Sequence, residues 1–188
     1  MEIICETSMR HVHLSGDDVE TLFGKGHKLQ HERSLSQPGQ FLCKERVTLK
    51  TDAWEFKNVA IIGPERPFSQ VEISRTDAFM LKIKNVPVRQ SGDLTDAPTL
   101  TVIVDDKSVE CATIVAQRHV HLDPKTAKEN NIDDGQIVGI QITGERSAIL
   151  ESVVARVSPS FAPAVHIDGD EANAVGNPKM VKILTQSK

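Results

Sequence analysis

The sequence predicts a mainly β protein built from two similar small units of the barrel or sandwich kind. Its 188 residues contain many short runs in which apolar and polar residues alternate, and Gly, Pro, Asn or Asp bound most of these runs. Candidate helices are few and short. The pentapeptide Arg-His-Val-His-Leu occurs twice, at residues 10–14 and 118–122, which indicates an internal duplication.

Five segments have the alternation expected of half-buried strands. They are RVTLK from Arg46, VEIS from Val71, TLTVIV from Thr99, QIVGIQIT from Gln136 and ESVVARVS from Glu151. The segment 27–41 has weak periodicity and is interpreted as a loop, either solvated or facing a substrate. The segment 87–98 is rich in turn-forming residues and is a candidate boundary between two halves.

A signal for the start of a helix follows each copy of the pentapeptide. Ser15 is placed to cap a helix that has Asp18 at its third position. Asp123 is placed to cap a helix that begins with Pro124, where the missing amide hydrogen costs nothing. A third short helix is expected from Asp170. Each copy therefore predicts a strand that carries His-x-His, followed by a capped helix.

The composition excludes several classes of function. The formal net charge is −4, with one Trp, no Tyr and no cluster of basic residues, so we expect no binding to nucleic acid. The three cysteines, Cys5, Cys43 and Cys111, form no CxxC motif and suggest buried thiols in a reducing compartment. No stretch approaches the ~20 apolar residues that span a bilayer, and the first residues do not resemble a signal peptide. We therefore expect a soluble intracellular protein without a membrane partner.

The two His-x-His pairs are candidate metal ligands, because residues i and i+2 of a strand lie on the same face. The pairs are His11 with His13, and His119 with His121. Zinc in catalytic sites commonly has three protein ligands, so each pair needs about one more donor. Glu72 and His166, which lie in strand-like segments, are the candidates. A single His-x-His is more often a pair without a metal, but repetition with identical flanking residues favours metal binding.

Arginines lie beside these motifs, and guanidinium groups together with metal ions suit an anionic oxygen substrate such as phosphate. They are Arg10, Arg118, Arg66, Arg75 and Arg156. Arg66 stands out, because it lies in a Gly-Pro turn six residues before Glu72. His27 and His31 have i, i+4 spacing but are expected to be exposed and not to bind metal.

Seven segments, in this order and spacing, resemble the PduL-type phosphate acyltransferases, which interconvert acyl-CoA and acyl phosphate in bacteria. They are RHVHLS, SQPGQF, GPERPFSQVEISRTDAF, VRQSGD, QRHVHLDP, ARVS and HIDGDEANA, from about Cys5 to Ala174. The resemblance implies two β-barrels capped by short helices, with a two-zinc active site between them. One barrel would comprise residues 1–9 and 117–188 and the other residues 10–116, in place of a simple split near residue 90.

The resemblance also implies roles for individual residues. One zinc ion would be held by His11, His13 and Glu72, and the other by His119, His121 and His166. The polar residues of the pocket would be Gln37, Gln40, Arg66, Gln70, Ser91 and Arg156. Asn173 would face coenzyme A. Leu42, Cys43 and Lys44 replace the small residues usual in the family after Phe41, so no role is assigned to Cys43.

The expected activity is therefore a phosphotransacylase that acts on acyl-CoA, phosphate and acyl phosphate, with an acetyl or propanoyl group, by direct transfer. Its expected state is a homodimer. Only ten residues precede His11, so no extension for encapsulation in a bacterial microcompartment is visible and we expect a cytoplasmic enzyme. The alternatives are a metal-dependent phosphoesterase or acyl-phosphate hydrolase, a noncatalytic protein with structural zinc, and a route through an acyl-cysteine at Cys43.

Overall fold

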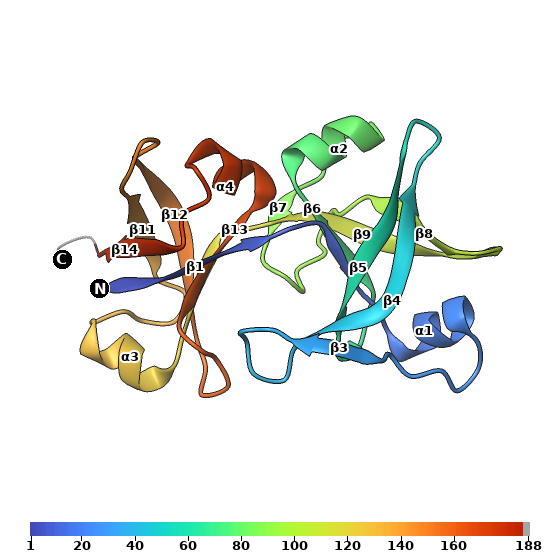
Figure 1. Ribbon diagram of the computed structural model, residues 1–188, viewed down its shortest axis with the longest axis horizontal. Coiled ribbons are helices and arrows are strands. Elements are labelled where there is room, and N and C mark those ends of the chain that lie inside the picture. Colours follow the sequence, from blue (N-terminus) through green and yellow to red (C-terminus); the bar gives the residue numbers. More distant parts are fainter. Residues whose placement is uncertain (186–188) are drawn as a thin grey trace. The chain divides into compact units, whose positions relative to one another are not determined.

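The chain divides into two compact units in a computed structural model that describes residues 1–185 (Figure 1). Unit 1 consists of Met1–Ser8 and the chain from Gln117 onward, and unit 2 consists of Met9–Ala116. Each unit has a hydrophobic core of its own. Val12 and Val120, which alternate with the paired histidines, are fully buried in the cores of unit 2 and unit 1. The predicted mainly β class is confirmed.

Unit 2 is a closed ring of six strands with two strands attached. Its elements are β2 (His11–His13), α1 (Gly16–Phe23), β3 (His31–Ser34), β4 (Phe41–Lys50), β5 (Glu55–Gly63), β6 (Gln70–Ile73), α2 (Arg75–Leu81), β7 (Val88–Arg89), β8 (Thr99–Val104) and β9 (Lys107–Ala116). The order around the ring is β2-β6-β9-β8-β4-β5. Strand β3 pairs with β4, and β7 pairs with β9.

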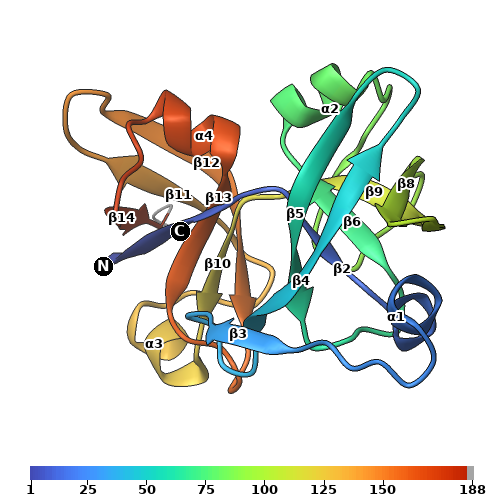
Figure 2. The ribbon, with the colours of Figure 1, turned by 45° about the vertical axis from the view of Figure 1, so that its right-hand side comes forward.

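Unit 1 is also a closed ring of six strands. Its elements are β1 (Glu2–Ser8), β10 (His119–Leu122), α3 (Pro124–Glu129), β11 (Ile137–Ile142), β12 (Ala148–Val157), β13 (Ala164–Asp168), α4 (Gly169–Ala174) and β14 (Met180–Leu184). The order around the ring is β10-β13-β1-β14-β11-β12. Figure 2 shows β10, β12 and β13 side by side in this unit.

The two rings match strand for strand, which extends the duplication from the pentapeptide to the whole barrel. In unit 2, the His-x-His strand β2 pairs antiparallel with β6 and parallel with β5. In unit 1, the His-x-His strand β10 likewise pairs antiparallel with β13 and parallel with β12. The next strand around the ring of unit 2 is β9, which pairs parallel with β6. At the equivalent place in unit 1, β1 pairs parallel with β13. The first strand of the chain therefore takes the place in unit 1 that the last strand of the repeat takes in unit 2.

Most predicted elements are present. The five predicted strand segments fall within or overlap β4, β6, β8, β11 and β12, and the Ser15 and Asp123 side chains accept hydrogen bonds from the first turns of α1 and α3. The third helix, α4, is capped by Asp168. Several further elements were not predicted from the sequence, namely strands β3, β5, β7, β9 and β14 and helix α2. Helix α2 has no clear apolar stripe, and the Phe79 side chain on it is 82% exposed. Strand β3 lies within the expected loop 27–41 and is exposed throughout, so it lacks alternation.

No helix in residues 1–185 is both long and apolar enough to cross a lipid bilayer.

Candidate functional site

Three donor side chains of unit 2 converge at the pairing of β2 with β6. His11 lies directly opposite Glu72 in this antiparallel pair. The Nε2 atoms of His11 and His13 are 3.2 Å apart, and they lie 3.6 and 3.7 Å from the Glu72 carboxylate oxygens. Two ligands that are each ~2.0–2.1 Å from a tetrahedral zinc ion stand roughly 3.3–3.4 Å apart. The three distances match that spacing to within a few tenths of an ångström.

Backbone carbonyl groups orient both imidazole rings of this group. Nδ1 of His11 lies 2.8 Å from the Met9 carbonyl oxygen, and Nδ1 of His13 lies 2.9 Å from the Ile62 carbonyl oxygen. A neutral ring that donates from Nδ1 has a lone pair at Nε2, so the two Nε2 lone pairs face one another and the carboxylate. Such an arrangement is repulsive without a cation, and it is the usual way in which a metal-binding histidine is held.

A chain of polar side chains leads from Glu72 to Arg66. Nε2 of Gln70 donates to Glu72 Oε1 at 2.5 Å and to Ser91 Oγ at 2.8 Å, and Nη1 of Arg66 donates to the same hydroxyl at 2.9 Å. Burial opposes ionisation of Glu72, but the neighbouring His11 and His13, with Ser91 and Arg66, hold its pKa at about 2. Three of the predicted pocket residues thus form one network with a predicted ligand.

The protonation states of His13 and Glu72 at neutral pH favour metal binding in this group. Burial, with a smaller contribution from the neighbouring His11, lowers the pKa of His13 to about 3. The His13 ring is therefore neutral and Glu72 is ionised at neutral pH. These are the forms in which histidine and carboxylate bind a metal ion.

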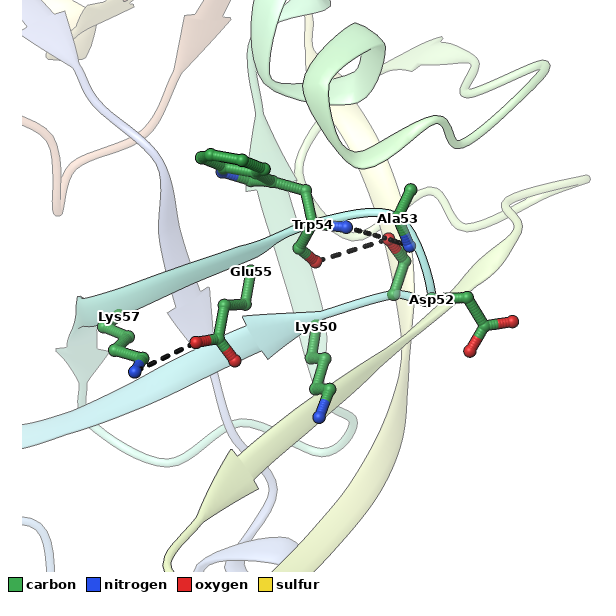
Figure 3. Close-up of a pocket in the computed structure, with 7 residues that line it drawn as sticks. Lys50, Asp52, Ala53, Trp54, Glu55 and Lys57 are labelled. Atoms are coloured by element: carbon green, nitrogen blue, oxygen red, sulfur yellow. Dashed lines mark hydrogen bonds and ion pairs between the residues drawn. The ribbon is translucent and has the colours of Figure 1, made fainter.

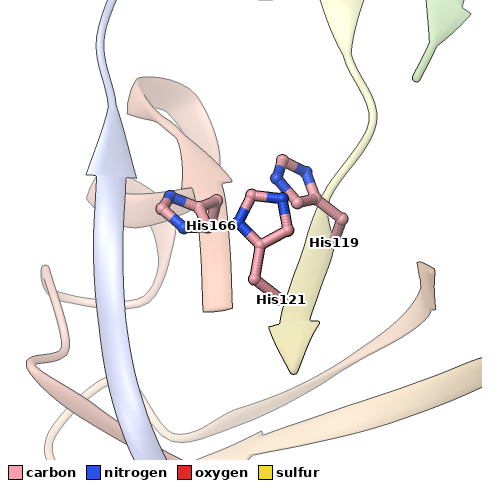
Figure 4. A group of neighbouring side chains, drawn as sticks. All are labelled: His119, His121 and His166. Atoms are coloured by element: carbon pink, nitrogen blue, oxygen red, sulfur yellow. The ribbon is translucent and has the colours of Figure 1, made fainter. Parts of the chain in front are cut away.

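Unit 1 has an equivalent group of three histidines, shown in Figure 4. His119 lies directly opposite His166 in the antiparallel pair of β10 with β13, as His11 does opposite Glu72. The centroid of the His119 ring is 4.7 Å from that of His121 and 5.0 Å from that of His166. Nδ1 of His119 lies 2.9 Å from the Gln117 carbonyl oxygen, which repeats the contact of His11 with Met9.

His121 is buried, yet neither of its ring nitrogens has a hydrogen-bond partner within the described part of the chain. Its ring stacks on Phe161 with 4.0 Å between centroids. Burial, with smaller contributions from His119, His166 and Arg156, lowers the pKa of His121 to about 2, so the ring is neutral. A buried neutral imidazole without a hydrogen bond is energetically unfavourable, and a metal ion would satisfy it.

Both groups can therefore hold a metal ion. In each of them, one ligand atom per residue lies within 4.8 Å of the others. Imidazole nitrogen and carboxylate oxygen are the donors of three-ligand zinc sites. His27 and His31 lie outside both groups; Nε2 of His27 is 2.7 Å from Glu45 Oε1, and His31 begins strand β3.

The remaining predicted pocket residues are less closely tied to the two groups. Arg156 lies on β12 directly beside His121 in the parallel pair with β10. Gln37 is buried and Gln40 is half-buried in the turn between β3 and β4, where the Gln40 amide donates to the Gln37 carbonyl. Asn173 is exposed on α4. The assignment of these residues to a substrate pocket stays a prediction.

Three residues near the groups were not identified from the sequence. Phe161 stacks on His121, Asp77 contacts Arg10, and Glu171 contacts Arg118. Asp77 and Glu171 do have a local sequence signal, because each is the third residue of its helix and completes a Ser/Asp-x-x-Asp/Glu capping box. No local pattern marks Phe161.

Unit 2 also has a hollow of about 630 Å³ at the turn between β4 and β5 (Figure 3). Its lining includes Trp54, two lysines and two acidic residues, and Lys57 pairs with Glu55 at 3.0 Å. It contains no histidine and none of the predicted site residues. We therefore do not connect this hollow with the candidate site.

Comparisons with known proteins show the family to which this chain belongs. The model of the family described as phosphate propanoyltransferase matches residues 4–178. The phosphate propanoyltransferase of Enterococcus faecalis is 47% identical over 173 residues, which cover 91% of this chain and 82% of the relative. Those of Listeria monocytogenes and Clostridioides difficile are 45% and 46% identical, covering 94% and 97% of this chain and 84% and 88% of the relatives. The predicted resemblance is confirmed, and the chain belongs to the phosphate propanoyltransferase family of acyltransferases.

Proposed function

We propose that the chain interconverts a short-chain acyl-CoA and phosphate with the acyl phosphate and coenzyme A, and that each three-donor group holds one zinc ion. Membership of the family supports a phosphotransacylase activity. The observation that carries the metal assignment is the convergence of two imidazole lone pairs on one carboxylate at 3.2–3.7 Å. The unpartnered ring of His121 supports the second ion.

A zinc ion in each group would supply a Lewis acid for oxygen atoms of phosphate or of the thioester carbonyl. The groups themselves supply the fixed imidazole and carboxylate donors. Because His11, His13 and Glu72 of one group and His121 of the other are buried, a ligand bound beside either group is partly shielded from bulk water. Electrostatic interactions are stronger in such an environment than at the surface.

Arg66 is the side chain that we assign to phosphate. The guanidinium is planar and can bind two phosphate oxygens, and its Nη1 is held by Ser91 Oγ at 2.9 Å. Ser91 is in turn held by Gln70, which also contacts the metal-binding carboxylate of Glu72. The network therefore fixes the proposed phosphate-binding arginine relative to the proposed ligand Glu72. Arg156, beside His121, is assigned to the negative charge that develops on the carbonyl oxygen.

We propose direct transfer. A phosphate oxygen attacks the thioester carbonyl carbon, the new C–O bond forms, and the C–S bond breaks as coenzyme A leaves as a thiolate. In the reverse direction the thiolate attacks the acyl phosphate. The alternative acyl-cysteine requires a reactive thiol, but Cys43 is fully buried and burial raises its pKa to about 11. A thiol with such a pKa is protonated at neutral pH and is a poor nucleophile.

The test is release of free coenzyme A by the purified full-length chain. Acetyl-CoA and propanoyl-CoA are assayed separately, with and without phosphate, before and after removal of metal by a chelator, while circular dichroism reports the fold. We expect release that requires both phosphate and metal, about two zinc ions per chain, and a fold that survives chelation because each barrel has its own closed core. The ratio of the two rates ranks the acyl groups.

Other outcomes would contradict specific parts of the proposal. Release without phosphate indicates thioester hydrolysis. No release with acyl-CoA, together with phosphate production from acyl phosphate or a phosphate ester, indicates the hydrolase. Unfolding on chelation, without any transfer activity in the metal-loaded protein, indicates structural zinc.

A further inference from the structure

An arginine precedes each His-x-His pair, and each arginine contacts a carboxylate on a helix of its own unit. Nε and Nη2 of Arg10 donate to Asp77 Oδ1 at 2.9 and 2.6 Å. Nε of Arg118 lies 2.8 Å from Glu171 Oε1 and forms an ion pair with it. The contact is thus repeated in the two halves, although the acidic residue differs.

Each carboxylate also holds the start of its helix. Asp77 Oδ2 accepts from the Ser74 amide at 3.2 Å, and Glu171 Oε2 accepts from the Asp168 amide at 3.1 Å, so both belong to capping boxes. One oxygen of each carboxylate therefore fixes the helix and the other binds the arginine.

The sequence distances from these contacts to the donor groups are short. Arg10 is adjacent to His11, and the cap residue Ser74 follows Glu72 by two positions. In unit 1, Arg118 is adjacent to His119, and the cap residue Asp168 follows His166 by two positions. In each unit the contact therefore ties the strand of the His-x-His pair to the end of the strand that carries the third donor.

We propose that Arg10–Asp77 and Arg118–Glu171 are positioning pairs that set the donor-to-donor distances of the group in their own unit. This inference rests on the proposed metal groups. It gives Arg10 and Arg118 a role other than phosphate binding, because a carboxylate already contacts each guanidinium group. Partners that orient metal ligands in this way typically change metal affinity about 10–100-fold when they are removed.

The test is zinc affinity, measured on the full-length chain by competition with a chromophoric chelator. We expect Arg118→Gln and Arg10→Gln each to weaken one of the two zinc sites about 10–100-fold and to leave the other site unchanged. The variant that combines Arg10→Gln with Arg118→Gln should weaken both zinc sites. The control is Lys57→Gln, which removes an exposed 3.0 Å contact with Glu55 outside both groups and should leave both affinities unchanged.

Two further variants separate positioning from stability. The Asp77 side chain is only 5% exposed, so Arg10→Gln leaves a buried charge and destabilises unit 2. The double variant Arg10→Gln with Asp77→Asn removes that charge and should fold normally, yet still bind zinc more weakly in unit 2. Arg118→Lys keeps one charged nitrogen for the contact with Glu171. It should recover most of the zinc affinity that Arg118→Gln loses.

The possible results distinguish the rival explanations. A lower midpoint of urea unfolding with both zinc affinities unchanged would show a purely structural role. A raised KM for phosphate at saturating zinc would show contact with substrate instead. If wild-type protein binds two zinc ions and the arginine variants bind them equally well, this inference is wrong and the proposed function stands. If wild-type protein binds no zinc, both are wrong.

Discussion

The two donor groups are built on the same barrel but differ in charge and in how they are held. The group of His11, His13 and Glu72 is buried, includes a carboxylate, and has a carbonyl acceptor at Nδ1 of each histidine. The group of His119, His121 and His166 has three imidazoles. In this group Nδ1 of His119 contacts a backbone carbonyl oxygen, whereas the His121 ring stacks on Phe161.

The residues beside the two groups differ as well. Opposite His13 the sheet has Gln70, which donates to the Glu72 carboxylate, whereas opposite His121 it has Ala164, which has no polar side chain. A zinc ion with two imidazoles and a carboxylate retains one positive charge, and one with three imidazoles retains two. We infer that duplication followed by exchange at one position produced a tightly held group and a more electropositive group.

The largest effect is expected from Glu72→Gln, which removes the only charge of the first group. The glutamine keeps the shape of the side chain but presents a weaker donor to a site that is otherwise neutral. We expect loss of about one zinc ion per chain and a fall in turnover on the order of 100-fold or more. Zinc per chain, measured by elemental analysis, and phosphate-dependent release of coenzyme A report the two effects.

The matched control is Glu45→Gln in the same unit. Glu45 also pairs with a histidine, His27, at 2.7 Å, but it lies outside both groups. This variant should cost stability without loss of zinc. Near-normal turnover and full zinc content in Glu72→Gln would refute a ligand role for Glu72.

A smaller effect is expected from His166→Glu, which makes the second group resemble the first. Two imidazoles and a carboxylate still bind zinc, so the metal should remain. The site loses one positive charge and gains a carboxylate near Glu6, whose Oε2 is 3.7 Å from His166 Nδ1. We expect turnover to fall about tenfold, equivalent to roughly 1.4 kcal/mol in the barrier.

Glu6→Gln in the His166→Glu background should recover part of that loss, because it removes the repulsion between the two carboxylates. The single variant Glu6→Gln serves as the control. Unchanged turnover in His166→Glu would show that the difference in charge between the two groups has no role in transfer.

A still smaller effect is expected from Phe161→Leu, which tests the unusual support of His121. Leucine keeps the apolar contact but removes ring stacking, which is worth about 0.5–1.5 kcal/mol, so zinc affinity of the second group should fall about two- to tenfold. The first group contains no such stacking and should be unaffected. Chelator competition resolves the two sites, and equal weakening of both would contradict the assignment of Phe161 to one group.

The two His-x-His pairs could be recognised in the sequence because their signal is local, whereas the assignment of a third residue to each pair came from the family resemblance. His-x-His in a strand places two rings on one face, and Glu72 and His166 stand in short alternating segments. Helix caps at Ser15 and Asp123 were predictable for the same reason, since each depends on residues within one turn.

Features that depend on distant pairing were not accessible from local pattern. Strand β1 completes the ring of unit 1 by pairing with β13, with Cys5 opposite Val165, and no local feature of either segment names the other. The contact of Arg10 with Asp77 spans 67 positions in the sequence. The stacking of Phe161 on His121 depends on how the residues between β12 and β13 fold back, which periodicity does not encode.

The smallest effect is expected from replacing Cys5, Cys43 and Cys111 together with alanine. All three are buried, and burial raises the pKa of each thiol, to about 11 for Cys5 and Cys43 and about 12 for Cys111. Because these thiols stay protonated at neutral pH, neither unit contributes a sulfur nucleophile, and neither donor group includes a sulfur ligand. We expect turnover within about twofold of wild type at 25 °C and a lower unfolding midpoint, since removing buried side-chain atoms leaves cavities. Iodoacetamide should fail to modify the folded wild-type chain at pH 7.5. A large loss of turnover with the fold and both zinc ions intact would instead favour the acyl-cysteine and contradict direct transfer.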